Sequence, residues 1–352
     1  MTSVSRLLQW SVKTSTTKWN VALNNKIASP SEPSEISHER IQQLHTQAKQ
    51  LLKHVAGVVL GKEDVARLCL VALYSGEHVL LEDVPGVGKT LMGKAIARSL
   101  DVDFCRIQFT PDLLPSDVLG GSVFNSQKSE FVFNRGPIFS NFVLADEINR
   151  APSRTQSALL EAMSDSQVSI DGETYQLPQP FMVIATQNPF ESEGTYALPE
   201  SQLDRFLLRI AMGYPDREFE SEILASHRDG QPVDQLQPIF DWQHVQQIQQ
   251  AVREVTVDDS ISQYLLEIVH ATRDSADLTI GVSTRGALAW YRAAQALAFL
   301  DSRQYVIPDD VKDLAVPVLS HRVSLQSVAA GGHRQDVEAI IRALTESVPS
   351  PA

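Results

Sequence analysis

The chain has 352 residues, of which 43% are hydrophobic and 21% are charged. This length can hold two domains, and the hydrophobic fraction suffices for buried cores, so a wholly disordered chain is excluded. The chain carries 30 Lys and Arg against 43 Asp and Glu, a net charge of -13. That charge argues against a protein whose main task is to bind nucleic-acid phosphates or an anionic membrane surface. No apolar stretch approaches the roughly 18 to 20 residues that a membrane-spanning helix needs.

Residues 1–37 differ in composition from the rest of the chain, because they are rich in Ser, Thr and Asn and end in a Ser- and Pro-rich run. Their one apolar cluster, residues 7–10, is too short for a secretory signal. We expect a flexible N-terminal tail or a misassigned start site, and we regard an organellar transit peptide as the weaker alternative.

Helical periodicity begins after the tail. Ser37 is a candidate cap for a helix whose apolar residues recur at helical spacing from Ile41 to Val55, and a second helix is expected over residues 63–74. Short apolar strands then alternate with helical or turn segments, which predicts a parallel sheet covered by helices on both faces. The expected strands are residues 78–82, 104–109, 142–146, 181–186 and 206–210, with a helix at 89–100.

The pattern changes after Pro215, where we expect helices alone. We therefore predict three parts: a tail at 1–37, an α/β nucleotide-binding core at 38–214, and a helical lid domain at 215–352. Cys69 and Cys105, the two cysteines of the chain, lie in apolar contexts that are typical of buried free thiols in a reducing compartment. The expected helices of the last part are residues 219–227, 244–252, 261–272, 286–300 and 309–319.

A glycine-rich turn with the sequence DVPGVGKT at residues 83–90 separates the first strand from the following helix. This is the context in which a loop binds phosphate, since Gly86 and Gly88 let backbone amides point inward and the helix adds its dipole. Lys89 is expected to reach the β and γ phosphates and Thr90 to bind Mg²⁺. Asp83 stands where the usual pattern has Gly, and this departure affects only the geometry of the turn that leads into the loop.

An acidic pair, Asp146 and Glu147, follows the apolar strand at 142–145. The carboxyl ends of parallel strands face the ligand crevice, so both side chains are expected beside the phosphate loop. Asp146 is suited to hold Mg²⁺, and Glu147 is suited to polarise an attacking water.

With these two motifs and four others in order, the chain resembles the AAA+ ATPases and, among them, the MoxR family. The resemblance covers residues 57–318, and it implies a P-loop core with β-hairpin insertions, followed by a helical lid. The segments that carry the resemblance are GVVLG at 57–61, the loop at 83–90, DEINRA at 146–151, ATQNP at 185–189, LPESQLDRF at 198–206 and STRG at 283–286.

The resemblance implies roles for individual residues. Asn188 would act as sensor 1 beside the γ-phosphate. Arg205 would act as an arginine finger on the neighbouring subunit's site, with a local salt bridge to Asp204 or Glu200 as the alternative and Arg209 as a competitor. Arg150 and Arg154 are expected to pair with local acids, with contacts to a neighbouring subunit as the alternative. The catalytic set is then Lys89, Glu147, Asn188 and Arg205, the metal ligands are Thr90 and Asp146, and the nucleotide-binding set is Val59, Pro85, Gly86, Val87, Gly88, Lys89, Thr90, Leu91 and Arg285.

Two β-hairpins are expected, at residues 120–133 and 166–177, the second with an Asp171-Gly172 turn. Their place in the series resembles the insertions that this group of ATPases carries, so we expect them to face a central pore and a partner. They hold no cluster of Lys and Arg, which disfavours a nucleic-acid track.

Taken together, the resemblance implies a cytoplasmic, Mg²⁺-dependent ATPase that forms a ring, expected to be a hexamer. It implies chaperone-like maturation or activation of protein complexes, with partners that carry a von Willebrand factor A domain. The alternatives are a chelatase-like subunit for metal insertion, a nucleic-acid-dependent motor, and a nucleotide-controlled binding module with negligible turnover.

Overall fold

The computed structural model describes residues 38–189, 194–226, 228, 230–326 and 334–351. The expected tail at 1–37, with the candidate cap Ser37, lies outside these residues. The described residues form one compact unit. Its α-helices are α1 (His38–Ala56), α2 (Glu63–Ser75), α3 (Lys89–Ser99), α4 (Pro115–Leu119), α5 (Ser153–Asp165), α6 (Glu200–Leu203), α7 (Arg217–Ser226), α8 (Trp242–Arg253), α9 (Asp259–Asp274), α10 (Thr284–Leu300), α11 (Pro308–Leu319) and α12 (Arg334–Ser347).

A five-stranded sheet forms the centre of this unit, and all four of its strand pairings are parallel, as the apolar runs predict. Every residue of β1 and β6 is buried, because helices cover both faces. The register pairs Glu82 with Gln187 and Gln108 with Asp146, so these polar residues meet at the carboxyl edge of the sheet. The strands, in spatial order, are β10 (Leu208–Ile210), β1 (Val79–Glu82), β9 (Met182–Gln187), β6 (Phe142–Asp146) and β3 (Phe104–Gln108).

Helices pack closely on the sheet. A Cβ at Gly93 of α3 would lie 3.0 Å from Cδ1 of Leu144, so the small residue lets α3 approach β6. On the other side, Leu159 and Leu160 of α5 join Val143 and Val183 in one buried cluster. This packing fixes α3, and with it the loop at 83–90, over the carboxyl edge of the sheet.

Both expected hairpins are confirmed. The first pairs β4 (Gly120–Asn125) with β5 (Glu130–Arg135), and the second pairs β7 (Gln167–Ile170) with β8 (Glu173–Gln176). Asp171 and Gly172 both have positive φ, of 53° and 83°, as a two-residue hairpin turn of this kind requires.

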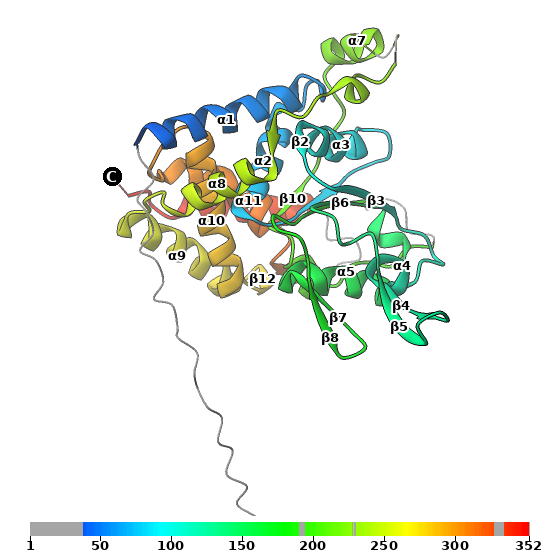
Figure 1. The fold of residues 1–352 in the computed structure, drawn as a ribbon. Helices are drawn as coiled ribbons and strands as arrows, with labels where there is room; N and C mark the ends of the chain where they lie inside the picture. Colours follow the sequence, from blue (N-terminus) through cyan, green and yellow to red (C-terminus); the bar gives the residue numbers. More distant parts are fainter. Residues whose placement is uncertain (1–37, 190–193, 227, 229, 327–333, 352) are drawn as a thin grey trace, which may run out of the picture. The chain divides into compact units, whose positions relative to one another are not determined.

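The two hairpins lie side by side (Figure 1). The rings of Phe133 and Tyr175 stack with centroids 4.3 Å apart, and Ser122 Oγ donates to Asp171 Oδ2 at 2.5 Å. The first hairpin also exposes Phe124 and Phe131, the latter with 72% of its surface accessible.

The segment beyond residue 215 is helical, as expected, but the structure adds three short strands that the sequence pattern did not indicate. β11 (Phe240–Asp241) pairs in parallel with β2 (Leu100–Asp101), and β12 (Leu278–Ile280) pairs with β13 (Ser324–Leu325). In addition, α1 and α2 contact α8 and α10. The two N-terminal helices therefore pack against the C-terminal helices as well as leading into β1.

Both cysteines are free thiols, as expected, but only Cys69 is buried, and Cys105 is half-buried. Burial raises the pKa of Cys69 to about 12. Over the described ranges, none of the helices combines the length and the apolar character that crossing a bilayer demands.

Candidate active site

The loop between β1 and α3 has the backbone that phosphate binding needs. Gly86 and Gly88 have φ of 87° and 97°, in the left-handed region where side chains are disfavoured. A Cβ at Gly86 would meet nothing within 4 Å, so backbone conformation, and not space, requires glycine there. The loop leads directly into the N-terminus of α3, whose free amides and dipole favour an anion.

Asp83, at the first position of the loop, stabilises the turn through its side chain. Its Oδ1 accepts from the backbone N–H of Val84 at 2.7 Å, and its Oδ2 accepts from the backbone N–H of Gly213 at 2.5 Å. Gly213 has φ of 65° and lies between β10 and α7. The departure from glycine thus ties the phosphate loop to the chain that leads out of the sheet.

Lys89 is oriented toward the carboxyl edge of the sheet. Its Nζ donates to the backbone carbonyl of Asp83 and, at 3.0 Å, to that of Gln187. Burial lowers the pKa of Lys89, an effect that the carboxylates of Asp83 and Asp146 oppose. The ammonium therefore lies where β1 and β9 end, next to the glycine loop.

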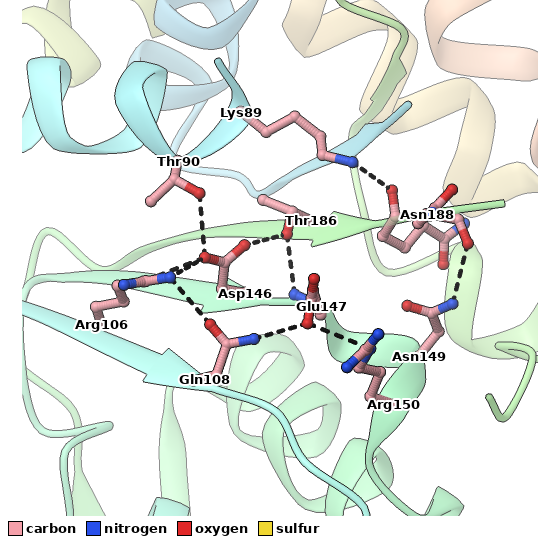
Figure 2. A network of polar contacts seen from close by, with 11 residues as sticks. Lys89, Thr90, Arg106, Gln108, Asp146, Glu147, Asn149, Arg150, Thr186 and Asn188 are labelled. Carbon is pink, nitrogen blue, oxygen red and sulfur yellow. Dashed lines mark hydrogen bonds and ion pairs between the residues drawn. The ribbon is translucent and has the colours of Figure 1, made fainter. Parts of the chain in front are cut away.

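Asp146 is the centre of a hydrogen-bonded network (Figure 2). It accepts from Thr186 Oγ1 at 2.6 Å, from Thr90 Oγ1 at 3.1 Å, and from Arg106 Nη2 at 2.7 Å. Burial raises the pKa of Asp146, but the hydrogen bonds from Thr186, Arg106 and Thr90 outweigh it and hold the pKa below its usual value. The carboxylate is charged at neutral pH.

The pair of Thr90 and Asp146 fits a magnesium ion. A hydroxyl and a carboxylate oxygen 3.1 Å apart are the hard ligands that Mg²⁺ takes, and this ion usually binds through one or two carboxylates plus substrate phosphates. No cluster of three or more His, Cys, Asp or Glu suited to a metal occurs in the described part of the chain, so a metal here would rely on phosphate and water for its other ligands.

Glu147 has a strained backbone and a restrained carboxylate. Its φ is 57°, in the left-handed region. Oε2 accepts from Gln108 Nε2 at 2.8 Å and pairs with Arg150 Nε at 3.3 Å, while the backbone N–H donates to Thr186 Oγ1 at 2.9 Å (Figure 2). The expected local pairing of Arg150 is confirmed by the contact with Glu147.

Arg106 and Gln108 were not singled out in the sequence. Arg106 Nη2 also donates to Gln108 Oε1 at 3.0 Å, so a continuous chain of contacts runs from Asp146 through both residues to Glu147. The sequence does contain a pattern that could have indicated them: two polar residues, two positions apart, in the strand expected at 104–109. Residues spaced in this way lie on the same face of a strand.

Asn188 directly follows β9, so it emerges at the same edge as Asp146 and Lys89. Its backbone carbonyl accepts from Asn149 Nδ2 at 3.2 Å (Figure 2). The structure thus places Asn188 beside the catalytic candidates, as the order of the motifs predicts.

A cavity of about 500 Å³ adjoins the phosphate loop. Its walls come from residues 58–60 and Lys62, from the loop itself, from Tyr214 before α7 and from Ile223 within α7. Gly61, with φ of 71°, lets the chain approach Phe219: a Cβ there would lie 2.7 Å from the ring. This hollow suits a flat, largely apolar base. Among the expected nucleotide-binding residues, Val59, Gly86, Val87, Gly88 and Leu91 line it.

Arg205 lies outside this network. Its Nη1 is buried and has no hydrogen-bond partner among the described residues. The two candidate local partners are engaged elsewhere: Asp204 pairs with Arg322 at 2.8 Å, and Glu200 accepts from Ser324 Oγ. The structure therefore does not show the alternative local salt bridge.

Arg209 and Arg285 occupy different surroundings from Arg205. Arg209 Nε is also buried without a hydrogen-bond partner among the described residues, but it forms an ion pair within its own chain, 3.6 Å from Glu82 Oε2, and only 13% of its side chain is exposed. Arg285 is exposed at the start of α10, and its positive charge favours lower pKa values for Glu77, His78 and Arg322. Glu77 and His78 precede β1, so Arg285 lies at the opposite end of that strand from the phosphate loop of its own chain.

Comparisons with known proteins agree with this geometry. Residues 78–208 match the family described as "ATPase family associated with various cellular activities (AAA)", and residues 270–344 match an AAA lid domain. The chain is 49% identical over 310 residues to the uncharacterized protein YeaC of Bacillus subtilis, covering 88% of this chain and 97% of YeaC. It is 42% identical over 292 residues to chaperone MoxR1 of Mycobacterium tuberculosis, covering 80% and 77%.

A solved structure also resembles this one. A Cytophaga hutchinsonii protein, provisionally described as an ATPase, has a TM-score of 0.80 and 40% identity, covering 89% of this chain and 98% of its own. The parallel sheet, the phosphate loop and the helical lid all belong to the same architecture. The chain is therefore a member of the MoxR family of AAA+ ATPases, enzymes that hydrolyse ATP.

Proposed function

We propose that the chain assembles into a closed ring, expected to be a hexamer, in which each ATP site is completed by Arg205 of a neighbouring subunit. This proposal is based on the side chain of Arg205. Its Nη1 is buried and has no hydrogen-bond partner among the described residues, and it takes no part in the hydrogen bonds around Asp146 and Glu147 of its own chain. A head-to-tail contact that brings one subunit's arginine to the next subunit's site repeats around a ring.

The chemistry follows from the residues at the carboxyl edge of the sheet. Glu147 accepts a proton from the attacking water as the bond from the γ-phosphorus to the bridging oxygen breaks, and Asn188 holds that water in line. Lys89 and Arg205 neutralise the charge that develops on the transferred group. Thr90 and Asp146 would hold Mg²⁺, which would supply positive charge to offset that of the phosphates.

Arg285 fits a role at a subunit interface in the same scheme. It is exposed at the start of α10 and lies with Glu77 and His78, away from its own phosphate loop. The start of a lid helix moves with the lid, so an exposed arginine there can report a neighbour's nucleotide to this subunit. We therefore assign Arg285 to contact with the adjacent subunit rather than with its own ATP.

We further propose chaperone-like work on protein complexes in the cytoplasm. A relative at 42% identity is named a chaperone, and the hairpin of β4 and β5 exposes apolar side chains that suit a protein client. The net charge of -13 and the Lys- and Arg-poor hairpins disfavour a nucleic-acid track. A partner with a von Willebrand factor A domain remains part of this proposal. Salt-dependent stimulation of ATP turnover by DNA would contradict the assignment to a protein client.

Mixed rings test the shared site. Lys89→Ala subunits lack a working phosphate loop and Arg205→Ala subunits lack the proposed finger, so each homomeric ring should be inactive. In a random 1:1 mixture about one site in four joins an intact loop to an intact arginine, so turnover should return to roughly a quarter of wild type. Mixed rings that form without any recovery would contradict a finger supplied by the neighbour.

A further inference from the structure

Arg322 is a buried arginine that no part of the proposed chemistry uses. It follows α11, and its side chain is only 2% exposed. Burial lowers the pKa of Arg322, and Asp204 opposes that shift, so the guanidinium stays charged beside its carboxylate. A charged group at this depth needs a partner for every donor.

All five N–H donors of the guanidinium have partners. Nε donates to Asp204 Oδ1 at 2.8 Å, and Nη2 donates to the backbone carbonyls of Phe206 at 2.6 Å and Asp204 at 3.3 Å. Nη1 donates to the carbonyl of Leu207 at 3.0 Å and to that of Val318 in α11. Four of the five bonds thus hold residues 204–207, and the fifth holds the helix.

The segment held in this way carries Arg205. The residue before Arg322, His321, adds a bond from its Nε2 to the carbonyl of Phe206 at 2.9 Å. The carbonyls of residues 204, 206 and 207 are therefore fixed to the end of α11, on either side of the arginine. Any movement of α11 must move this segment with it.

The lid also shapes the space that Arg322 fills. Gly286, in the first turn of α10, lies against the aliphatic part of the side chain: a Cβ there would be 2.8 Å from Cδ of Arg322. All five N–H donors of the guanidinium are hydrogen-bonded, so the side chain cannot move away from Gly286 without breaking some of these bonds. Two lid helices, α10 and α11, thus meet at the residue that holds residues 204–207.

We propose that Arg322 is a positioning residue, which fixes the backbone around Arg205 to the lid and thereby sets how that arginine is presented to the neighbouring subunit. This inference rests on the proposed role of Arg205 in a neighbour's site. It adds a route by which the lid of one subunit controls hydrolysis in the next, through Val318, Arg322 and the segment at 204–207.

Arg322→Lys keeps the charge but replaces the planar five-donor fork with three donors at one atom. Homomeric rings of this variant should turn over ATP about 10- to 100-fold more slowly, as expected for a misplaced catalytic group. The KM for ATP should stay within about twofold of wild type, because the phosphate loop is intact. A fall in nucleotide affinity that matches the fall in kcat would overturn the positioning role.

Mixed rings separate positioning from a general structural defect. Arg322→Lys subunits keep a working phosphate loop, so mixing them with Lys89→Ala subunits should restore about one competent site in four. Mixing them with Arg205→Ala subunits should restore nothing, because every subunit then presents a defective arginine. The reverse pattern, or no recovery with Lys89→Ala, would overturn the proposal.

The reference mixture of Lys89→Ala with Arg205→Ala separates a failure of the shared ATP site from a failure of the role proposed for Arg322. If it does not recover, the shared site itself is wrong and the inference fails with it. If it recovers and the Arg322→Lys mixtures do not follow the pattern above, the shared site stands and the inference alone is wrong.

Gly286→Ala provides a second variant in case Arg322→Lys does not assemble, since it removes no donor and crowds Cδ of Arg322 most closely, at 2.8 Å, with Cγ1 of Val282 next at 3.0 Å. It should reproduce the same complementation pattern with a smaller loss of kcat. Leu288→Ala, on the same helix at a position 56% exposed, is the matched control and should behave like wild type. Equal activity of Gly286→Ala and Leu288→Ala would overturn the link from the lid to Arg322.

Discussion

Gln108 donates a hydrogen bond to the carboxylate of Glu147, with 2.8 Å between Nε2 and Oε2. Arg150 approaches the same oxygen at 3.3 Å. The group proposed to take the proton from water is therefore oriented by two donors on one oxygen. Because Gln108 also accepts from Arg106, the orientation of Glu147 is connected to the carboxylate of Asp146, which is proposed to hold Mg²⁺.

Replacing Gln108 with Ala should lower kcat about tenfold, which corresponds to ~1.4 kcal/mol of lost orientation, while the KM for ATP changes little. The amide touches Glu147 and not the nucleotide pocket, so binding is spared. Steady-state turnover with ATP titration measures both constants, with the exposed Gln127→Ala as control. Unchanged kcat would show that Glu147 does not depend on this bond.

Replacing Arg106 with Met should lower the Mg²⁺ concentration needed for half-maximal turnover several-fold. The guanidinium lies 2.7 Å from Asp146 Oδ2, so it opposes a second cation at the same carboxylate. The same change removes a charged hydrogen bond from a buried group and should lower the stability of the fold by about 1–3 kcal/mol. Mg²⁺ titration of turnover and thermal unfolding check the two effects, and a raised Mg²⁺ requirement would contradict the first.

Replacing Asp83 with Gly restores the usual residue of such loops but removes both hydrogen bonds to Val84 and Gly213. The loop should then no longer be held to the segment around Gly213, beside the cavity. ATP should bind about tenfold more weakly, which corresponds to a loss of ~1.4 kcal/mol of binding free energy. Asp83→Asn keeps one acceptor and should show a smaller loss. Fluorescent nucleotide binding measures the series; tighter binding by the Gly variant would show that Asp83 only replaces glycine.

Acid should destabilise the protein through His78. Its Nε2 lies 3.1 Å from the carbonyl of Met163 and its Nδ1 accepts from the backbone N–H of Val183 at 3.1 Å, so a second proton on the ring would break the latter bond. Burial lowers the pKa of His78 to about 4, below the unfolded value of 6.5. The neutral ring therefore contributes stability above pH 6.5 that is lost as pH falls toward 4, on the order of 2–3 kcal/mol.

His78→Gln should flatten the decline of the unfolding midpoint between pH 7 and pH 5, although it lowers the midpoint at pH 7. The exposed His270→Gln is the control and should leave the pH profile unchanged. Equal slopes for wild type and His78→Gln would assign the acid sensitivity to other groups, of which the buried His321, whose pKa burial also lowers, is the next candidate.

Local patterns predicted those parts of the molecule whose chemistry is local. The glycines at 86 and 88 are required by backbone conformation, and Asp146 and Glu147 follow a buried strand, so the sequence places them at one edge of a parallel sheet. The turn at Asp171 and Gly172 is likewise a local preference. These elements needed no knowledge of distant contacts.

Contacts between distant segments could not be predicted in this way. Asp204 was a candidate partner for Arg205, but the structure pairs it with Arg322, which is 118 residues away in the chain. No periodicity marks that pair, because it depends on how α11 packs beside β10. The short strands β11 to β13 were missed for the same reason, since two or three residues carry too little pattern to outweigh a helical background.

The most direct measurement on the central claim is ATP turnover by Glu147→Gln, made together with ATP binding. The substitution keeps the shape of the side chain but removes the carboxylate that takes the proton, so turnover should fall at least about 100-fold while ATP binds as in wild type. Lys89→Ala, which should lose binding itself, is the control. Turnover equal to wild type in Glu147→Gln would contradict the assignment of Glu147 and, with it, the catalytic scheme built on this edge of the sheet.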